Sequence, residues 1–167
     1  MIVRITKLDN YKEINKNILS LIDKIPKNPF KDENQNISNT DWNLPQSFKR
    51  EYLNYFYKII TPYMDKIAII LDSKKWNINN GWFQQYTKSE GHEWHTHAKT
   101  NFTNVYFVEL PSTSLGTEIL NYQKLDLKEG DLLTLPGHVY HRSPKNFTNE
   151  RKTIISFNSD FFDYKGI

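Results

Sequence analysis

The sequence predicts an α+β fold that is mainly β, in which N-terminal helices support a sandwich or barrel of short strands. Apolar residues recur at helical spacing over residues 9–24 and 47–73, whereas from Gly81 onward the chain changes to short alternating segments. The 167 residues fit one domain. Within it we expect residues 1–80 to form mainly helical support and a surface loop, and residues 81–160 to form the β core.

The N-terminal half contains the expected helices. Residues 2–7 alternate apolar and polar side chains, which predicts an edge strand, and the helix over about 9–24 follows. Residues 25–45 are rich in Asn, Asp, Pro and Lys and are typical of a long surface loop. The stripe over 47–73 is interrupted at Pro62, so it predicts two consecutive helices or one kinked helix.

The C-terminal half contains the expected strands. Turn-forming Pro, Gly and Ser residues separate short segments whose side chains alternate, and no helical pattern lies between them. The expected strands lie at residues 82–86, 92–97, 104–110, 117–122, 131–135 and 152–158.

Composition excludes several classes of protein. The chain has no cysteine, so disulfide scaffolds, iron–sulfur clusters and thiol nucleophiles are excluded, and any metal must bind nitrogen or oxygen ligands. The net charge of +3 is spread over many Lys, Arg, Asp and Glu residues, which does not favour nucleic-acid binding. Neither a signal peptide nor an apolar run of about 18 residues is present. We therefore expect a cytoplasmic protein without a membrane span.

All five histidines of the chain lie in two short clusters: His92, His95 and His97 in one, and His138 and His141 in the other. In an extended strand, side chains two positions apart project from the same face, so His95 and His97 form a two-ligand metal clamp. A tight Pro-Gly turn precedes His141 and can bring it back to the clamp as the third ligand. We expect His92 and His138 to have supporting or surface roles.

A candidate anion receptor follows the second histidine cluster. Arg151 begins a predicted strand in which Arg151, Thr153 and Ile155 share a face. A guanidinium and a hydroxyl can bind a carboxylate through a bidentate pair and one further hydrogen bond. The alternative is that Arg151 forms an ordinary surface ion pair.

The pattern of His95-Thr-His97, then a Pro-Gly turn with His141, then Arg151-Lys-Thr153 resembles the 2-oxoglutarate and iron(II)-dependent oxygenases. These enzymes have His-x-Asp/Glu, a distal His and an Arg-x-Ser about ten residues beyond it. The resemblance covers roughly residues 80–160, and the chain is most similar to small prolyl-hydroxylase-like members of phage and marine bacterial type. It implies a double-stranded β-helix, also called a jelly roll or cupin-like barrel.

The resemblance also implies roles for individual residues. His95 and His141 correspond to iron ligands, and His97 stands where the superfamily usually has Asp or Glu, so a three-histidine site replaces the usual triad. Arg151 and Thr153 correspond to the residues that hold the far carboxylate of 2-oxoglutarate. Tyr86 precedes His95 by about the spacing of a tyrosine that helps to bind this cosubstrate in prolyl-hydroxylase-like enzymes.

The implied activity is that of a dioxygenase. With Fe(II), 2-oxoglutarate and O₂, and with ascorbate as a further candidate cofactor, it hydroxylates a peptide or protein side chain or a small metabolite and releases succinate and CO₂. The sequence identifies neither the substrate nor the oligomeric state.

Two other classes remain open. Gly130 and Pro136 followed by His141 resemble the second cupin motif, which predicts a metal-binding protein that does not use 2-oxoglutarate. The Glu of the first cupin motif is missing, because Asn101 and Phe102 stand at its expected positions. The other class is an interaction protein that keeps the fold without the chemistry.

Overall fold

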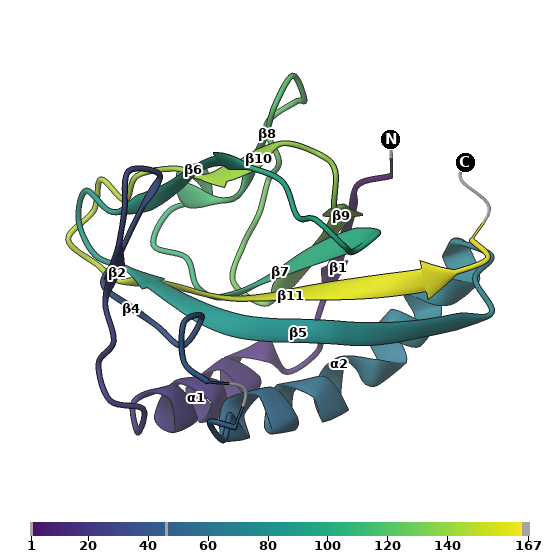
Figure 1. Cartoon of the computed structure of the whole chain (residues 1–167), viewed down its shortest axis with the longest axis horizontal. Coiled ribbons are helices and arrows are strands. Elements are labelled where there is room, and N and C mark those ends of the chain that lie inside the picture. Colours follow the sequence, from purple (N-terminus) through teal and green to yellow (C-terminus); the bar gives the residue numbers. More distant parts are fainter. Residues whose placement is uncertain (1, 46, 165–167) are drawn as a thin grey trace.

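The computed structural model describes residues 2–45 and 47–164, and within these residues two helices and two antiparallel sheets form three layers (Figure 1). Helices α1 (Tyr11–Ile22) and α2 (Glu51–Ile70) cover one face of the larger sheet, and the smaller sheet lies on the opposite side. The expected mainly β fold with N-terminal helices is therefore confirmed.

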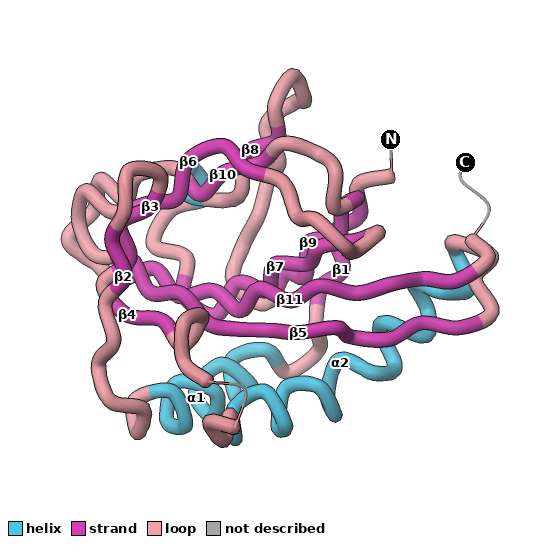
Figure 2. The backbone as a smooth tube through the Cα atoms, viewed as in Figure 1, coloured by secondary structure: helices cyan, strands magenta, loops and turns pink. Residues whose placement is uncertain are grey.

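The sheets bring together strands that are far apart in the sequence (Figure 2). The larger sheet runs in the order β1 (Arg4–Lys7), β9 (Asp131–Pro136), β7 (Phe102–Glu109), β11 (Lys152–Phe162), β5 (Lys75–Tyr86) and β4 (Asn39–Thr40). The smaller sheet runs in the order β2 (Phe30–Lys31), β3 (Gln35–Ile37), β6 (Gly91–His95), β10 (His141–Ser143) and β8 (Glu118–Ile119). Thr113–Leu115 form a short 3₁₀ helix before β8.

Apolar side chains fill the space on both sides of the larger sheet. Between the helices and this sheet, Phe56 and Met64 of α2 pack with Phe157 of β11 in one core cluster. Between the two sheets lies a second cluster that includes Ile154, while its neighbour Ile155 belongs to the first. Successive residues of β11 thus face opposite layers.

Helix α2 continues through Pro62 as one helix. Proline removes one backbone hydrogen-bond donor. Phe56 and Ile60 before it and Met64 and Ile67 after it are nevertheless all buried in the same core cluster. Burial of this common face outweighs the lost hydrogen bond. Within the described residues, no helix combines the length and the apolar character needed to cross a membrane.

Residues 25–45 are more ordered than the predicted surface loop. They contain β2, β3 and β4, and tertiary pairing accounts for them: β3 pairs with β6, and β4 pairs with β5. Strand β5 begins at Lys75, earlier than the expected start at residue 82, because it pairs with β11 along its whole length from Tyr86↔Lys152 to Lys75↔Phe162. The β region therefore starts before Gly81.

Candidate metal centre

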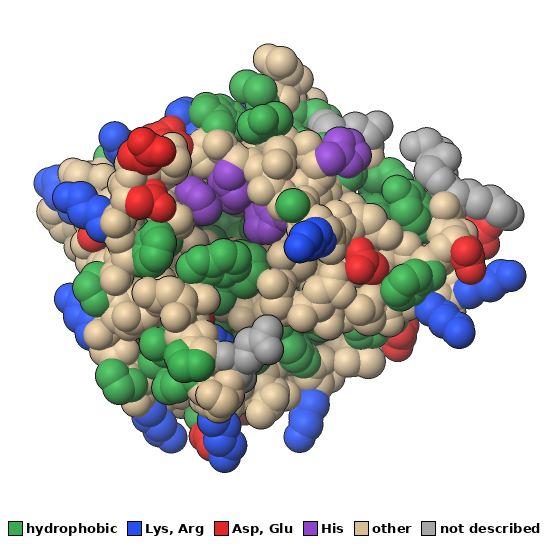
Figure 3. Space-filling model, viewed as in Figure 1, with side chains coloured by type: hydrophobic (Ala, Val, Ile, Leu, Met, Phe, Trp, Pro, Cys, Tyr) green, Lys and Arg blue, Asp and Glu red, His purple; other side chains and the backbone are tan. Residues whose placement is uncertain are grey.

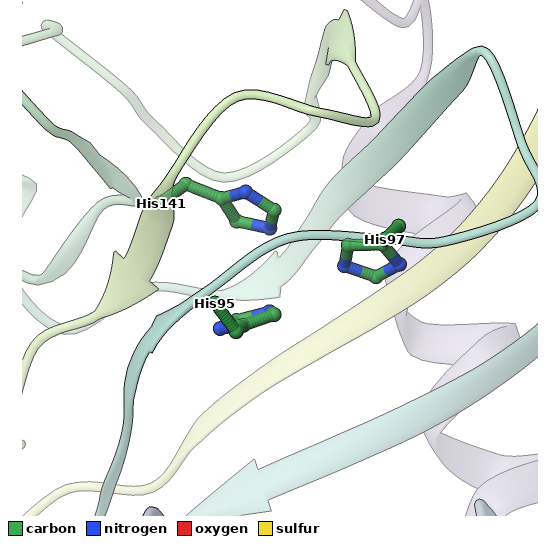
Figure 4. Close-up of side chains that lie close together, drawn as sticks. All are labelled: His95, His97 and His141. Atoms are coloured by element: carbon green, nitrogen blue, oxygen red, sulfur yellow. The ribbon is translucent and has the colours of Figure 1, made fainter.

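Three histidines meet where β6 and β10 pair. His95 ends β6 and is the register partner of His141 at the start of β10, so the two side chains project from the same face. His97 lies two residues beyond β6, where its backbone N–H donates to the carbonyl of Gly137 at 2.8 Å. Figure 4 shows the three rings around a common space, and one nitrogen from each ring lies within 4.8 Å of the others.

Backbone carbonyls orient two of these rings. Nδ1 of His95 lies 2.7 Å from the carbonyl oxygen of Glu93, and Nδ1 of His141 lies 2.9 Å from that of Val139. A carbonyl oxygen only accepts, so each Nδ1 carries the proton and donates it. Nε2 of both rings is therefore left with a free lone pair, as a metal ligand requires.

The electrostatics of the cluster keep the rings neutral. Burial lowers the pKa of His141 to about 3 and that of His97 to about 4, and the neighbouring histidines add to both effects. Burial also lowers the pKa of His95. Three neutral imidazoles fit a first-row transition metal such as iron or zinc and do not fit Mg²⁺ or Ca²⁺, which prefer oxygen ligands.

The remaining histidines lie outside this set of ligands. His92 stacks on His95 with ring centroids 3.7 Å apart and ring planes 6° from parallel, so it supports that ring. His138 is exposed. Glu93, a conceivable substitute carboxylate, lies 4.0 Å from the guanidinium of Arg142 and is not part of the cluster.

A cavity of about 420 Å³ opens beside the three histidines. Figure 3 shows histidine side chains grouped beside a hollow in the surface, with hydrophobic side chains along its edge. Trp42 and Trp82 form part of the wall, and neutral amide and hydroxyl side chains form much of the rest. Among the described residues that line the cavity, none is Asp or Glu.

The structure does not bring Arg151 and Thr153 to this cavity. The guanidinium of Arg151 binds the carboxylate of Glu109 through two hydrogen bonds of 2.8 and 3.1 Å, and it also lies 3.6 Å from a carboxylate oxygen of Asp23. The Thr153 hydroxyl donates to the same Glu109 carboxylate. An internal acid thus occupies the expected anion receptor, and the alternative of an ordinary ion pair describes Arg151.

The residue between them, Lys152, lies on the opposite face of β11 and is completely buried. Its Nζ donates to the hydroxyl of Ser143 at 2.7 Å and to the carbonyl of Leu115 at 2.5 Å. Lys152 forms no salt bridge with a described residue; burial lowers its pKa to about 7, and the carboxylate of Glu118, which is bound by Arg142, offsets only part of this effect. Nothing in the sequence pattern gave a reason to select this residue. Ser156 and Asn158, which lie on the same face of β11 as Lys152, line the cavity.

Tyr86 lies next to Lys152. The two residues are register partners, and the Lys152 ammonium lies 5.5 Å from the centroid of the Tyr86 ring. The Tyr86 hydroxyl is buried and forms no hydrogen bond of good geometry with any described residue. Tyr86 interacts with the hydroxyl of Ser143, which also accepts from Lys152. A buried lysine and a buried phenol thus lie side by side, with the Ser143 hydroxyl beside both.

Comparison with known proteins gives a match in structure and none in sequence. No family model matches the chain, and no curated protein matches it. A prolyl-4-hydroxylase from Pseudomonas putida is similar with a TM-score of 0.65 and 10% identity, over 95% of this chain and 92% of that one. The viral collagen prolyl hydroxylase of Paramecium bursaria Chlorella virus-1, in its 2-oxoglutarate complex, is similar with a TM-score of 0.63 and 14% identity, over 93% of this chain and 94% of that one.

A third similar structure has a different reaction in its name. The non-haem α-ketoglutarate-dependent epimerase SnoN of nogalamycin biosynthesis gives a TM-score of 0.70 at 11% identity, over 95% of this chain and 78% of that one. The fold is that of the 2-oxoglutarate and iron(II)-dependent oxygenases. The resemblance drawn from the sequence is therefore confirmed at the level of the fold.

Proposed function

We propose that this protein is a non-haem Fe(II) and 2-oxoglutarate-dependent oxygenase, built on a double-stranded β-helix, in which His95, His97 and His141 hold the iron. The observation that carries the proposal is the pairing of two features at one cavity. Three neutral imidazoles converge there, and a buried lysine without a carboxylate partner lies on a strand that lines the same cavity.

Lys152 is the residue that we assign to the far carboxylate of 2-oxoglutarate, in place of Arg151 and Thr153. A buried ammonium is costly unless it is paired, and a carboxylate would supply the missing charge. The Tyr86 hydroxyl, which has only a poorly aligned contact with Ser143, can donate to the same carboxylate, and the Ser143 hydroxyl lies beside both residues. Tyr86 keeps the role that the resemblance implied.

Bound iron(II) with 2-oxoglutarate and O₂ supplies the oxidant: a substrate C–H becomes C–OH while the cosubstrate is converted to succinate and CO₂. The residues of the chain position the reactants. His95 and His141 are held by backbone carbonyls, so their Nε2 atoms are oriented before any metal arrives. His97 is neutral where related enzymes carry a carboxylate, so this site holds one more positive charge and favours an anionic cosubstrate.

Anaerobic titration of the Fe(II)-loaded protein with 2-oxoglutarate tests this proposal. We expect a charge-transfer band in the visible range that saturates with cosubstrate, and we expect its loss in His95→Ala and His141→Ala. His138→Ala is the matched control, because that histidine is exposed and lies outside the cluster. Bound iron, verified by metal analysis, without any band would contradict the proposal.

The three-histidine set also supports a second candidate function. A cupin-type metal-binding protein would use the neutral triad to bind its substrate directly to the metal, without 2-oxoglutarate. The observation in its favour is His97 in the position of the usual carboxylate. Iron-dependent O₂ consumption that is indifferent to 2-oxoglutarate would identify this function.

A further inference from the structure

An exposed tryptophan stands at the mouth of the cavity on a tightly held loop. The Trp42 side chain is 49% exposed, although it packs edge-on against Trp82 with ring centroids 4.5 Å apart. Trp82 in turn stacks on His97 with ring planes 16° from parallel. An aromatic wall therefore leads from the surface to the candidate metal ligands.

The loop that carries Trp42 is fixed by a buried polar network. The carboxylate of Asp41, which is fully buried, accepts from Arg50 Nε at 2.8 Å, from the Tyr52 hydroxyl at 2.7 Å and from the Phe83 backbone N–H at 3.0 Å. The Trp42 backbone N–H donates to the Thr40 hydroxyl at 3.1 Å. The loop thus holds the large, solvent-exposed Trp42 ring in place before a ligand arrives. Such preorganisation favours ligand binding because little conformational entropy is then lost.

Most of the polar side chains in the same wall are neutral. Side-chain amides of Gln35, Asn80, Gln84 and Asn158 line the cavity. Such amides both donate and accept, as hydroxyl groups do. Arg142 is the cation in the lining, and its guanidinium is engaged by Glu118 at 2.7 Å. A charged substituent on a ligand would therefore find no free counter-charge among the described lining residues.

One of these amides has a carbonyl oxygen whose contact with the His97 ring is too poorly aligned to count as a full hydrogen bond. Oδ1 of Asn158 is buried and forms no hydrogen bond of good geometry with any described residue, although its side chain lies beside His97. A carbonyl oxygen needs a donor. A hydroxyl-bearing ring supplies one, whereas a prolyl ring within a peptide also stacks on tryptophan but has no N–H or O–H of its own.

We propose that the outer part of this cavity binds a neutral saccharide ring, with the apolar face of the ring on Trp42 and its hydroxyl groups on the surrounding amides. The proposal names the substrate class of the oxygenase proposed above and rests on that function. When one face of the saccharide ring packs on Trp42, its remaining hydroxyl groups are free to bind Gln84 and Asn158, which lie deeper in the cavity.

Saturation-transfer NMR and tryptophan fluorescence of the metal-free protein test this inference. The probes are the methyl glycosides of glucose, galactose and mannose, with glucosamine, glucuronate and a proline-rich peptide as comparisons. We expect saturable binding of at least one neutral glycoside, with the strongest transfer to the protons of one ring face. We expect weaker binding of both charged sugars and of the peptide.

Substitutions identify the site. Trp42→Ala should weaken glycoside binding roughly fivefold or more, as loss of an aromatic contact implies, and Trp42→Phe should restore most of it. Phe147→Ala is the control, because Phe147 is a 61% exposed aromatic residue outside the cavity, and it should have no effect.

The inference is overturned if no neutral glycoside binds, if only the peptide binds, or if Trp42→Ala binds as well as the wild-type protein. Because the experiment uses neither metal nor 2-oxoglutarate, its failure leaves the charge-transfer band unaffected. If instead the charge-transfer band is absent, glycoside binding to the metal-free protein can still be measured. The two proposals therefore fail through different measurements.

Discussion

Substitution of Lys152 by Met separates its binding role from its effect on stability. The methionine side chain keeps a similar length and removes the ammonium, which is completely buried in the protein. A hydrogen bond between charged groups contributes about 1.5–3 kcal/mol, and about 1.4 kcal/mol corresponds to a factor of ten. We therefore expect the Kd of 2-oxoglutarate to rise roughly 10- to 150-fold.

The same substitution should stabilise the protein when cosubstrate is absent. Burial lowers the pKa of Lys152 from its ordinary 10.5 to about 7, so between these values the unfolded chain binds more protons than the folded protein. The proton affinity of Lys152 is thus roughly three to four powers of ten lower in the folded protein than in the unfolded chain. Below pH 7 this difference lowers the free energy of unfolding by roughly 4–5 kcal/mol. The free energy of unfolding of the wild-type protein should therefore rise between pH 7 and 10.5, and Lys152→Met should lack this contribution.

Calorimetric titration with 2-oxoglutarate measures the first effect, and urea denaturation at pH 7 and pH 9 measures the second. Arg151→Met is the matched control, because it removes the adjacent cation, which is paired with Glu109 outside the cavity. It should leave the Kd of 2-oxoglutarate unchanged. If Arg151→Met weakens binding while Lys152→Met does not, the assignment of the anion receptor to Lys152 is refuted.

Three further predictions concern the metal ligands and the Trp42 loop. His97→Ala should weaken Fe(II) binding at least tenfold in a competition titration while His138→Ala does not, and equal affinities would remove His97 from the ligand set. In the folded protein the pKa values of the three histidine ligands lie below the ordinary 6.5, so the unfolded chain takes up protons first as the pH falls below 6.5. The Tm of the metal-free protein should therefore decrease below pH 6.5. A Tm that stays constant from pH 6.5 to 4 would contradict the burial of neutral rings. Asp41→Ala should cost about 3–5 kcal/mol in urea denaturation, since it leaves Arg50 without its buried partner, whereas Lys49→Ala at an exposed ion pair should not change stability measurably.

The histidine part of the site could be predicted from the sequence because it depends on local spacing. His95 and His97 are two residues apart in the sequence, so short-range geometry was enough to pair them; His141 was added because a Pro-Gly turn can bring it back and because it matches the distal histidine of the family pattern. Their cross-strand pairing in the structure agrees with that expectation. The supporting carbonyls of Glu93 and Val139 are each two residues from the histidine that they orient, yet backbone acceptors carry no signal in the sequence.

The anion receptor that we propose, Lys152, could not be predicted because its position depends on which side chains of β11 face the cavity. Ile154 and Ile155 are both apolar and each faces a hydrophobic core, so alternation does not reveal which face of β11 lines the cavity. In its pairing with β7 the strand also has an irregularity between Thr153 and Ile154. The acid that engages Arg151 is Glu109, and that contact across the strands depends on this register. The strands within residues 25–45 were missed for a similar reason, since pairing with β5 and β6 forms them.

The two adjacent cations Arg151 and Lys152, at the start of β11, illustrate why the buried position suits lysine. A guanidinium keeps its proton at any ordinary pH, so an arginine buried at position 152 would carry a permanent charge without a carboxylate whenever cosubstrate is absent. The pKa of Lys152 is lowered by burial to about 7, so the residue can give up its proton in the empty site and take it back when a carboxylate arrives. Arg151, always charged, instead lies directly before β11 between Glu109 and Asp23, where it links the start of β11 to β7 and to the end of α1.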